Sequence, residues 1–294
     1  MAAILALVAS ASALRPATSC TLHPAASFTL RRAAVPRMAL TEREERVAAA
    51  MEIKPVVQES ARSTGLALEL DDGTRKSHSM AENTQFVTGF FRGIATKASF
   101  AQLVTALYFV YEAMESEFDS CTDSRVLALD YPELRRLAAL ELDMEYYHGS
   151  DWRSHVQPSA ATRAYVARVV EVARETPELL IAHQYTRYLG DLFGGQMMGG
   201  MARKSLQLEA SLGTSFYEFE RIPDTKAFIE SWYRRLNELE LTDDQRRAIV
   251  DEGNRVFALN IEIFEELEGN PAKAVLTLAL TSLKSALGLG RREE

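Results

Sequence analysis

Cysteine is nearly absent from this sequence. Only Cys20 and Cys121 occur among the 294 residues, and Cys20 lies in an N-terminal segment that we interpret below as a removable leader. A mature chain with one cysteine forms neither an internal disulfide nor a cysteine-bound metal cluster. A long apolar run is missing too. The amphipathic stretch from Pro271 to Leu287 has only a short apolar run and contains Lys284, so we expect no membrane span.

Basic residues are fewer than acidic ones, and the formal net charge is -8. The segment before Leu40 contains no acidic residue, and without it 29 basic and 41 acidic residues remain, a net charge of -12. The four basic residues of that segment are Arg15, Arg31, Arg32 and Arg37. This excess of negative charge argues against nucleic acid or an anionic membrane as the main partner.

Residues 1–38 are predicted to be a targeting leader outside the fold. Residues 2–13 are an apolar run ending in Ala-Ser-Ala, as at the cleavage site of a signal peptide, although no basic residue precedes the run. Residues 14–38 are rich in Ser, Thr, Ala and Arg, which is typical of a transit peptide. Together they resemble the bipartite leader of algae with secondary plastids. A one-step plastid or mitochondrial leader is the alternative.

From Thr41 onward the sequence shows helical periodicity, with neither a convincing strand pattern nor an internal repeat. We predict an all-α fold in which residues 65–269 form a single multi-helix domain. Residues 39–64 are predicted to add an N-terminal helix, and residues 270–294 a C-terminal tail helix. One predicted helix carries its apolar residues on a single face: Phe100, Leu103, Leu107, Val110, Met114 and Phe118.

Capping residues and prolines mark the predicted helix starts. Asp130 and Pro132 predict one start, because Asp is a good N-cap and Pro is tolerated in the first turn. Thr242 and Gln245 have the spacing of a capping box, which opens a long helix. That helix carries Phe257, Asn260, Phe264 and Leu267. Further starts are predicted at Pro158, Pro177 and Pro223.

Five glycines fall within eleven residues: Gly190, Gly194, Gly195, Gly199 and Gly200. The flanking stretches, 177–188 and 201–210, are predicted to be helical. Glycine in a helix costs about 0.5–1 kcal/mol relative to alanine, so a chain that keeps several uses bare backbone for the close approach of something large and flat. A loop is the commoner meaning of such a cluster, and these residues alone leave it open.

Neither a phosphate loop nor a membrane helix interface accounts for the glycines. A phosphate loop requires a preceding strand and a following Gly-Lys-Ser/Thr, and both are missing. A membrane helix interface is interrupted by Arg187, Asp191 and Arg203. Arg187 and Asp191 are four residues apart and therefore share a helical face with the glycines that follow. We predict a bent helix whose bare face carries one guanidinium and one carboxylate.

Two motifs resemble those of a known family. Residues 185–196 have the sequence Tyr-Thr-Arg-Tyr-Leu-Gly-Asp-Leu-Phe-Gly-Gly-Gln, which closely resembles the distal helix of the heme oxygenases. Residues 75–83, Arg-Lys-Ser-His-Ser-Met-Ala-Glu-Asn, resemble their proximal helix. The resemblance runs from about Gly65 to Gly269 and is greatest to the cyanobacterial and algal plastid branch. It implies a fold in which heme lies between a proximal helix and a kinked, glycine-rich distal helix.

The resemblance implies that His78 is the iron ligand. Glu82 follows four residues later on the same helical face, where a carboxylate commonly holds the second ring nitrogen of a ligating histidine. The remaining histidines of the mature chain, His148, His155 and His183, match no ligand position and are interpreted as structural.

On the distal side, the resemblance implies that Asp191 holds a water that donates to the oxygen being activated. Gly190 and Gly194, with Gly195 beside them, would let the helix backbone approach that oxygen and the ring. The family's extended hydrogen-bond network is matched by Tyr111, Tyr165, Arg187 and Asn260. Phe257 and Phe264 are assigned to the heme-binding wall, although core packing would also explain them.

The sequence departs from the family where basic residues usually anchor the heme propionates by charge-assisted hydrogen bonds. Three such positions are Asp71, Ile229 and Tyr233. Arg75 and Tyr185, which share that role in the family, are retained. Arg234 or Arg235 could substitute for the lost cations.

Two further departures lie on the distal helix. Phe193 replaces a small serine, and the pair Gly199–Gly200 replaces two lysines where an electron donor is thought to dock. We therefore expect changes in heme affinity, ring orientation and donor preference, but not in the iron ligand or the oxygen network.

The predicted function is a plastid heme oxygenase that uses heme as both substrate and cofactor. It would open heme to biliverdin with O2 and release CO and ferrous iron. Ferredoxin is the expected electron donor, and a bilin reductase could act downstream in bilin synthesis. The alternative is a non-catalytic heme-binding relative, a carrier or sensor. A helical scaffold without heme is disfavoured, because it gives no reason for Arg187, Asp191 and the glycines to occur together.

Overall fold

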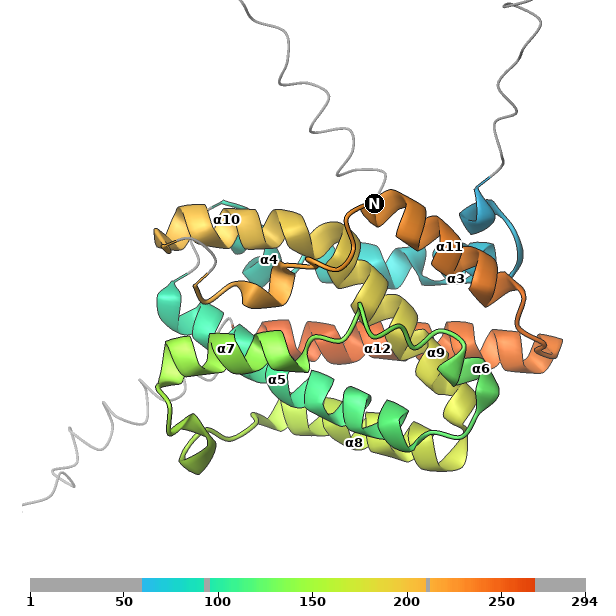
Figure 1. The fold of residues 1–294 in the computed structure, drawn as a ribbon, viewed down its shortest axis with the longest axis horizontal. Coiled ribbons are helices and arrows are strands. Elements are labelled where there is room, and N and C mark those ends of the chain that lie inside the picture. Colours follow the sequence, from blue (N-terminus) through green and yellow to red (C-terminus); the bar gives the residue numbers. More distant parts are fainter. Residues whose placement is uncertain (1–59, 93–95, 210–211, 268–294) are drawn as a thin grey trace, which may run out of the picture. The chain divides into compact units, whose positions relative to one another are not determined.

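The computed structural model describes residues 60–92, 96–209 and 212–267 (Figure 1). Within these ranges every regular element is helical, which confirms the all-α prediction. The predicted leader, the tail from residue 270 and most of the predicted N-terminal helix lie outside the described residues. The elements are η1 (Ala61–Ser63), α3 (Gly65–Glu82), α4 (Gln85–Phe91), α5 (Lys97–Ser120), α6 (Ser124–Leu127), α7 (Leu137–His148), η2 (Trp152–Ser154), α8 (Ala160–Glu175), η3 (Pro177–Leu179), α9 (Leu180–His183), η4 (Gln184–Leu189), η5 (Asp191–Gly195), α10 (Gln196–Leu206), η6 (Ser215–Tyr217), α11 (Thr225–Asn237) and α12 (Asp243–Leu267).

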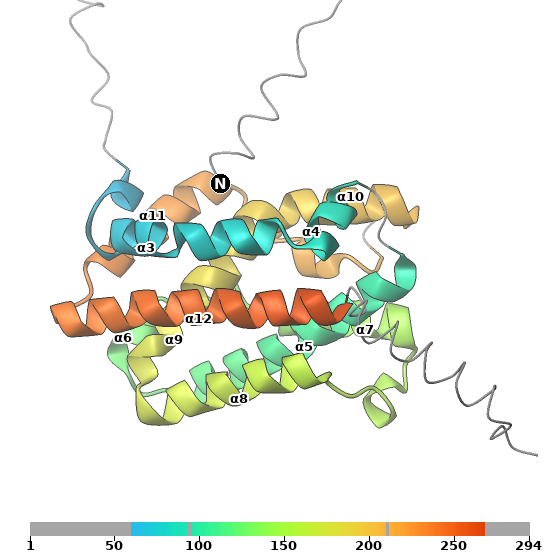
Figure 2. The ribbon, with the colours of Figure 1, turned by 180° about the vertical axis from the view of Figure 1, so that it is seen from behind.

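Helix α12 packs against α3, α4, α5, α8 and α9. In Figure 2 it runs between α3 and α4 on one side and α5 and α8 on the other. Its start is the predicted capping box. The Thr242 N–H donates to Gln245 Oε1 at 3.0 Å, and the Gln245 N–H donates to Thr242 Oγ1 at 3.2 Å. No helix among the described residues combines the length and apolarity that a membrane crossing requires.

The predicted apolar face of α5 is confirmed, since all six of its residues are buried. The predicted helix start at Asp130 is wrong. The chain makes a turn around Pro132, and α7 begins only at Leu137. Asp130 instead binds Arg135, with Nη2 and Oδ2 2.5 Å apart. Glu115 of α5 accepts the N–H of Arg136 at 2.6 Å and of Leu137 at 3.1 Å, so a carboxylate from another helix satisfies the start of α7.

The glycine-rich stretch is helical throughout, which excludes a loop. The chain passes from α9 through the π-helical segments η4 and η5 into α10, and Gly190 between them keeps a helical conformation (φ -60°). We call residues 180–206 the distal helix. Wide π turns inside a helix occur frequently at functional sites. The helix ends at Leu206, before the predicted end at Ala210, because Gln207 adopts a left-handed conformation (φ 53°).

The predicted N-terminal helix is not present in the residues described before Gly65. These residues form the short 3-10 turn η1, and α3 begins at Gly65 with a φ of +55°. The Asn237 side chain of α11 fills the space that a Cβ at Gly65 would occupy, with its Oδ1 2.8 Å away. Glycine is therefore required at this position by both conformation and space.

Candidate functional site

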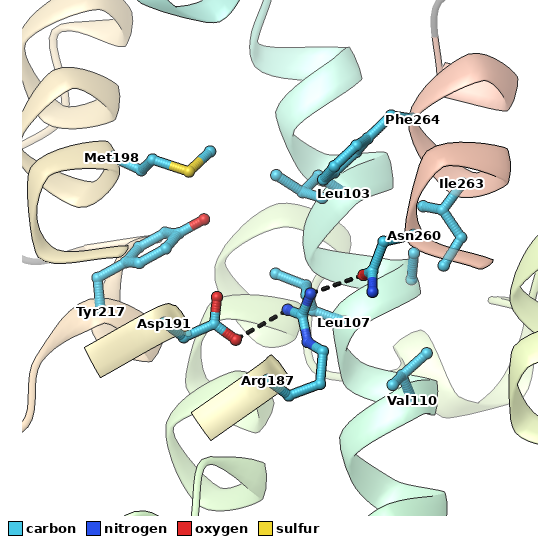
Figure 3. Close-up of a pocket in the computed structure, with 11 residues that line it drawn as sticks. Leu103, Leu107, Val110, Arg187, Asp191, Met198, Tyr217, Asn260, Ile263 and Phe264 are labelled. Carbon is cyan, nitrogen blue, oxygen red and sulfur yellow. Dashed lines mark hydrogen bonds and ion pairs between the residues drawn. The ribbon is translucent and has the colours of Figure 1, made fainter. Parts of the chain in front are cut away.

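A cavity of about 40 Å³ lies against the distal helix (Figure 3). Its walls are mostly apolar, and a cavity of this size holds small molecules such as a few waters. The lining comes from α5, the distal helix, η6 and α12: Leu103, Ala106, Leu107, Val110, Arg187, Asp191, Met198, Tyr217, Asn260, Ile263 and Phe264. Four of these side chains are polar, and three belong to the set predicted from the sequence. Tyr217 was not predicted.

Three helices contribute one hydrogen-bonded chain to this cavity. Asp191 Oδ2 accepts from the Tyr111 hydroxyl at 2.5 Å and from Arg187 Nη2 at 2.8 Å. Arg187 Nη1 donates to Asn260 Oδ1 at 2.7 Å, and Asn260 Nδ2 donates to the Val256 carbonyl at 2.8 Å. Figure 3 shows Arg187 standing between the carboxylate and the amide. The structure thus brings together four of the polar residues that the sequence predicted for this network.

The two carboxylate oxygens of Asp191 differ in their contacts. Both described hydrogen bonds go to Oδ2, whereas Oδ1 bonds to no described residue and points toward the cavity in Figure 3. Burial raises the pKa of Asp191, and Arg187 and the Tyr111 hydroxyl act against that rise. Burial and the Asp191 charge raise the pKa of Tyr111 well above its usual value, so its hydroxyl remains a donor.

Tyr165 is the predicted network member that the structure leaves unbonded. Its side chain is fully buried, and its hydroxyl has no hydrogen-bond partner among the described residues. Asn260 is close enough to influence the pKa of Tyr165, which burial raises, but the hydrogen bonds described for its amide go to Val256 and Arg187. Arg187 Nε is likewise buried without a described partner. Both atoms could bond an ordered water.

The glycines of the distal helix serve two different purposes. A Cβ at Gly190, Gly194 or Gly200 would meet nothing within 4 Å, so the backbone there borders open space. A Cβ at Gly195 would lie 3.0 Å from the Tyr217 ring, and one at Gly199 would lie 2.7 Å from Tyr217 Cβ. Gly195 and Gly199 therefore allow Tyr217 to pack on the helix, which places its ring at the cavity.

His78 lies on α3 with its side chain 34% exposed. Burial lowers the pKa of His78 and Glu82 partly offsets this effect, so the imidazole is neutral at pH 7, the form that binds a metal. Its Nδ1 lies 3.6 Å from Glu82 Oε2, an electrostatic contact rather than a hydrogen bond. Nε2 makes no hydrogen bond within the described part of the chain.

Helix α12 connects His78 to the distal network. The Phe257 ring meets the His78 ring edge to face, with centroids 5.5 Å apart. Asn260, one turn further along α12, holds Arg187. Phe264, another turn on, lines the cavity and stacks on Phe86 with centroids 5.6 Å apart. One face of α12 therefore contacts both the predicted iron ligand and the predicted oxygen network.

Comparison with known proteins shows the family to which the chain belongs. Residues 64–266 match the family model described as heme oxygenase. The chain is 47% identical to heme oxygenase 1 of Synechocystis over 79% of this chain and 96% of that protein. It is 44% identical to the heme oxygenase of Pyropia yezoensis over 74% and 92%, respectively. The chain belongs to the heme oxygenase family.

This heme oxygenase is an oxidoreductase that degrades heme to biliverdin, which confirms the predicted fold and reaction. Its structure matches the crystal structure of Synechocystis heme oxygenase-1 in complex with heme, with a TM-score of 0.68 and coverage of 75% of this chain and all of that one. The described residues fit such a ligand. The bare helix face at Gly190 and Gly194 has open space, and His78 offers an unbonded Nε2.

The cations predicted to anchor the heme carboxylates are engaged elsewhere. Arg75 is 70% exposed and pairs with Asp72. Arg234 lies 3.7 Å from Glu230, and Arg235 3.3 Å from Glu238, each a neighbour on its own helix or just beyond its end. Nothing in these contacts supports the prediction that Arg234 or Arg235 substitutes for the lost anchors.

Arg62 is the basic residue that sequence reasoning missed. It forms an ion pair with Asp71, and Tyr185 and Tyr233 are close enough to influence its pKa. Burial raises the pKa of Tyr185 to about 12, and Asp71 adds to the rise. Arg62 thus lies among two of the three positions where this chain has lost a basic residue. Its only signal in the sequence is a lone arginine shortly before Gly65, in the segment predicted to be an added N-terminal helix.

Proposed function

We propose that this heme oxygenase works in a plastid, where it opens heme to biliverdin with release of CO and ferrous iron for bilin synthesis. Electrons would come from ferredoxin. The support is the composition of residues 1–38 and 41–44% identity to heme oxygenases of the algae Pyropia yezoensis, Rhodella violacea and Guillardia theta. A bilin reductase would take the product onward.

His78 would hold the heme iron through Nε2, with Glu82 beside Nδ1 to orient the ring. The bound heme supplies the iron that activates O2 and the carbon that is oxidised. Gly190 and Gly194 would let the distal backbone lie close to that oxygen, because no side chain intervenes. Phe257 and Phe264 would form part of the apolar wall, and Gly195 would keep Tyr217 in place.

The observation that carries this proposal is that the two carboxylate oxygens of Asp191 have different surroundings. Oδ2 is fixed by Tyr111 and Arg187, while Oδ1 stays available at the cavity. A water held by Oδ1 would deliver a proton to a defined place. Burial raises the pKa of Asp191, and Arg187 opposes that rise. In its carboxylate form Asp191 would accept a hydrogen bond from that water at Oδ1. Tyr165 and Asn260 would extend the proton path behind Arg187 through ordered waters.

The test is a spectrum of the purified protein mixed with heme and a reductant in air. Decay of the Soret band into a biliverdin spectrum is expected. A stable Soret band would mean a non-catalytic heme binder, and no Soret band would exclude heme as the substrate. Comparing ferredoxin with a chemical reductant then tests the electron donor. A fusion of residues 1–38 to a fluorescent protein tests whether this segment directs a protein to the plastid.

A further inference from the structure

The turn that carries Arg62 is fixed to α11 by a set of hydrogen bonds. Glu230 accepts from the Ala61 N–H at 2.7 Å and from the Ser60 hydroxyl at 2.8 Å. Asn237 donates to the Ala61 carbonyl at 2.7 Å and accepts from the Ala67 N–H at 2.9 Å. The backbone on both sides of Arg62 is therefore held independently of the Arg62 side chain. The hydrogen bond from the Ala61 N–H lowers the pKa of Glu230, so this carboxylate keeps its charge.

From this turn the Arg62 side chain reaches α3 and forms its ion pair with Asp71. The side chain is 34% exposed, and Asp71 is the acceptor of its one described hydrogen bond. A guanidinium has five N–H donors, so most of its donors remain available to a ligand. Burial lowers the pKa of Arg62, but the Asp71 carboxylate outweighs that effect, and the charge is permanent.

Two tyrosine hydroxyls accompany this guanidinium. Tyr185 and Tyr233 both interact with the Arg62 charge, and burial raises the pKa of each, so both remain protonated donors. One permanent cation and two hydroxyls make a site for an anionic oxygen ligand. Asp71 limits it, because its charge neutralises Arg62 and repels a carboxylate.

We infer that Arg62 binds a carboxylate of heme in this chain, in place of the basic residues that are absent at Asp71, Ile229 and Tyr233, and that Asp71 weakens this binding. The inference rests on the proposed function for its ligand. It moves the anchor from the usual helices to the turn before α3. It also makes two of the lost positions, Asp71 and Tyr233, neighbours of the anchor, beside the retained Tyr185.

The test is a heme titration followed by the Soret band, at low and high ionic strength. Arg62→Gln should weaken binding roughly ten- to a hundredfold, the loss expected for one charge-assisted contact. Asp71→Asn should tighten binding a few-fold, and this gain should vanish in the double variant with Arg62→Gln. Both effects should shrink in high salt, because the site is partly exposed. Arg174→Gln removes the same charge from the exposed side of α8, where Arg174 is 72% exposed, and should change nothing.

Heme dimethyl ester separates carboxylate recognition from general damage to the site. It has no anionic oxygen, so wild type and Arg62→Gln should bind it equally. A parallel loss with heme and with the diester would overturn the inference, and so would an unchanged heme affinity in Arg62→Gln. Arg62→Lys, which keeps the charge, should fall between wild type and Arg62→Gln, and it serves if the glutamine variant unfolds. If the wild type itself binds no heme, the proposed function fails and not only the anchor.

Discussion

At the scale of single residues, the site depends on the different surroundings of the two carboxylate oxygens of Asp191. The two oxygens of Asp191 are chemically equivalent, yet the protein ties one to Tyr111 and Arg187 and leaves the other at the cavity. The fixed oxygen determines where the free one points. A proton donor held by the free oxygen then has a defined position, which is the contribution expected from a group that acts by positioning.

Removing the Asp191 charge should therefore affect turnover and not heme binding. Asp191→Asn keeps the size of the side chain and an acceptor for Tyr111, but it loses the anion that pairs with Arg187. We expect biliverdin formation to slow by about 10²–10⁴, with more destruction of heme to other products. Stopped-flow spectra with product chromatography measure both. Normal heme affinity serves as the control, and a rate within a few-fold of wild type would remove Asp191 from the mechanism.

Replacing His78 should abolish the normal heme spectrum while the helices remain. His78→Ala removes the only ligand proposed for the iron, and within the described ranges the aromatic contact of its ring is with Phe257 alone. Added imidazole should partly restore the spectrum, because the missing ligand is a neutral ring nitrogen. His148→Ala, on α7, is the matched control and should leave the Soret band unchanged. A wild-type band in His78→Ala would assign the ligand elsewhere.

Residues of the site that belong to a local motif could be predicted from the sequence. Residues that reach the site only through contacts with distant segments could not. Asp191 and Arg187 are four residues apart on one helix, so their pairing could be predicted. Tyr217 and Arg62 come from short 3-10 turns with no periodic pattern. Tyr217 reaches the cavity because two glycines of another element leave room for its ring. No propensity of the Tyr217 segment itself contains that information.

At the scale of helices, the distal helix continues through its glycines, although the low helix propensity of glycine would suggest that the helix stops there. Each glycine weakens the helix locally, but packing against α12 and η6 holds the chain in π geometry. The start of α7 shows the same limit, since its cap, Glu115, comes from α5. The faces of α5 and the capping box of α12 were predictable because they depend only on neighbouring residues.

The two adjacent glycines Gly199 and Gly200 should respond oppositely to alanine. Gly200 is exposed and has open space, so Gly200→Ala should stabilise the fold by about 0.5–1 kcal/mol through the better helix propensity of alanine. Gly199→Ala places a methyl 2.7 Å from Tyr217 Cβ and should cost about 1–3 kcal/mol. Urea denaturation measures both. Equal effects of the two substitutions would contradict the packing described for Tyr217.

A buried ion network joins α8, α9 and α12. Glu252 accepts from Arg168 Nε at 3.0 Å and Nη2 at 2.5 Å, and His183 Nε2 lies 3.2 Å away. Burial alone would raise the pKa of Glu252, but His183 and Arg168 outweigh it and lower the pKa to about 2. This pKa lies below that of the unfolded chain, so the carboxylate stabilises the fold fully above about pH 4.5. The contribution is lost as the pH falls toward 2.

Glu252→Gln should therefore lower the free energy of unfolding by about 3–5 kcal/mol at pH 7, because the Arg168 guanidinium, which is 19% exposed, loses its bidentate carboxylate partner. The difference from wild type should narrow as the pH is lowered from 4.5 toward 2. Glu171→Gln is the matched control. It also pairs with Arg168, at 2.9 Å, but it is 47% exposed and should have little effect. A pH-independent difference for Glu252→Gln would mean that the carboxylate acts by packing alone.

At the scale of the whole molecule, charge should govern the encounter with the electron donor. The chain carries a net charge of -8, which becomes -12 without the first 38 residues. Gly199 and Gly200 stand where the family usually has two lysines. The structure has room for a lysine side chain at only one of these two positions. Gly199 is buried beneath Tyr217, whereas Gly200 is exposed next to open space. A lysine at Gly200 would join Arg203 and Lys204 on the last turns of α10.

Gly200→Lys should raise the rate of ferredoxin-supported turnover at low salt, by roughly a few-fold, with little change when a chemical reductant supplies the electrons. A ferredoxin that docks through carboxylates is drawn to the added charge, and such steering acts mainly on the association rate. The gain should disappear at about 0.5 M salt, where exposed charges are screened over a few ångströms. Gly200→Ala separates this effect from helix propensity, since it stabilises α10 without adding charge. An equal gain for alanine and lysine, or a gain that survives high salt, would place the donor's docking surface away from the distal helix.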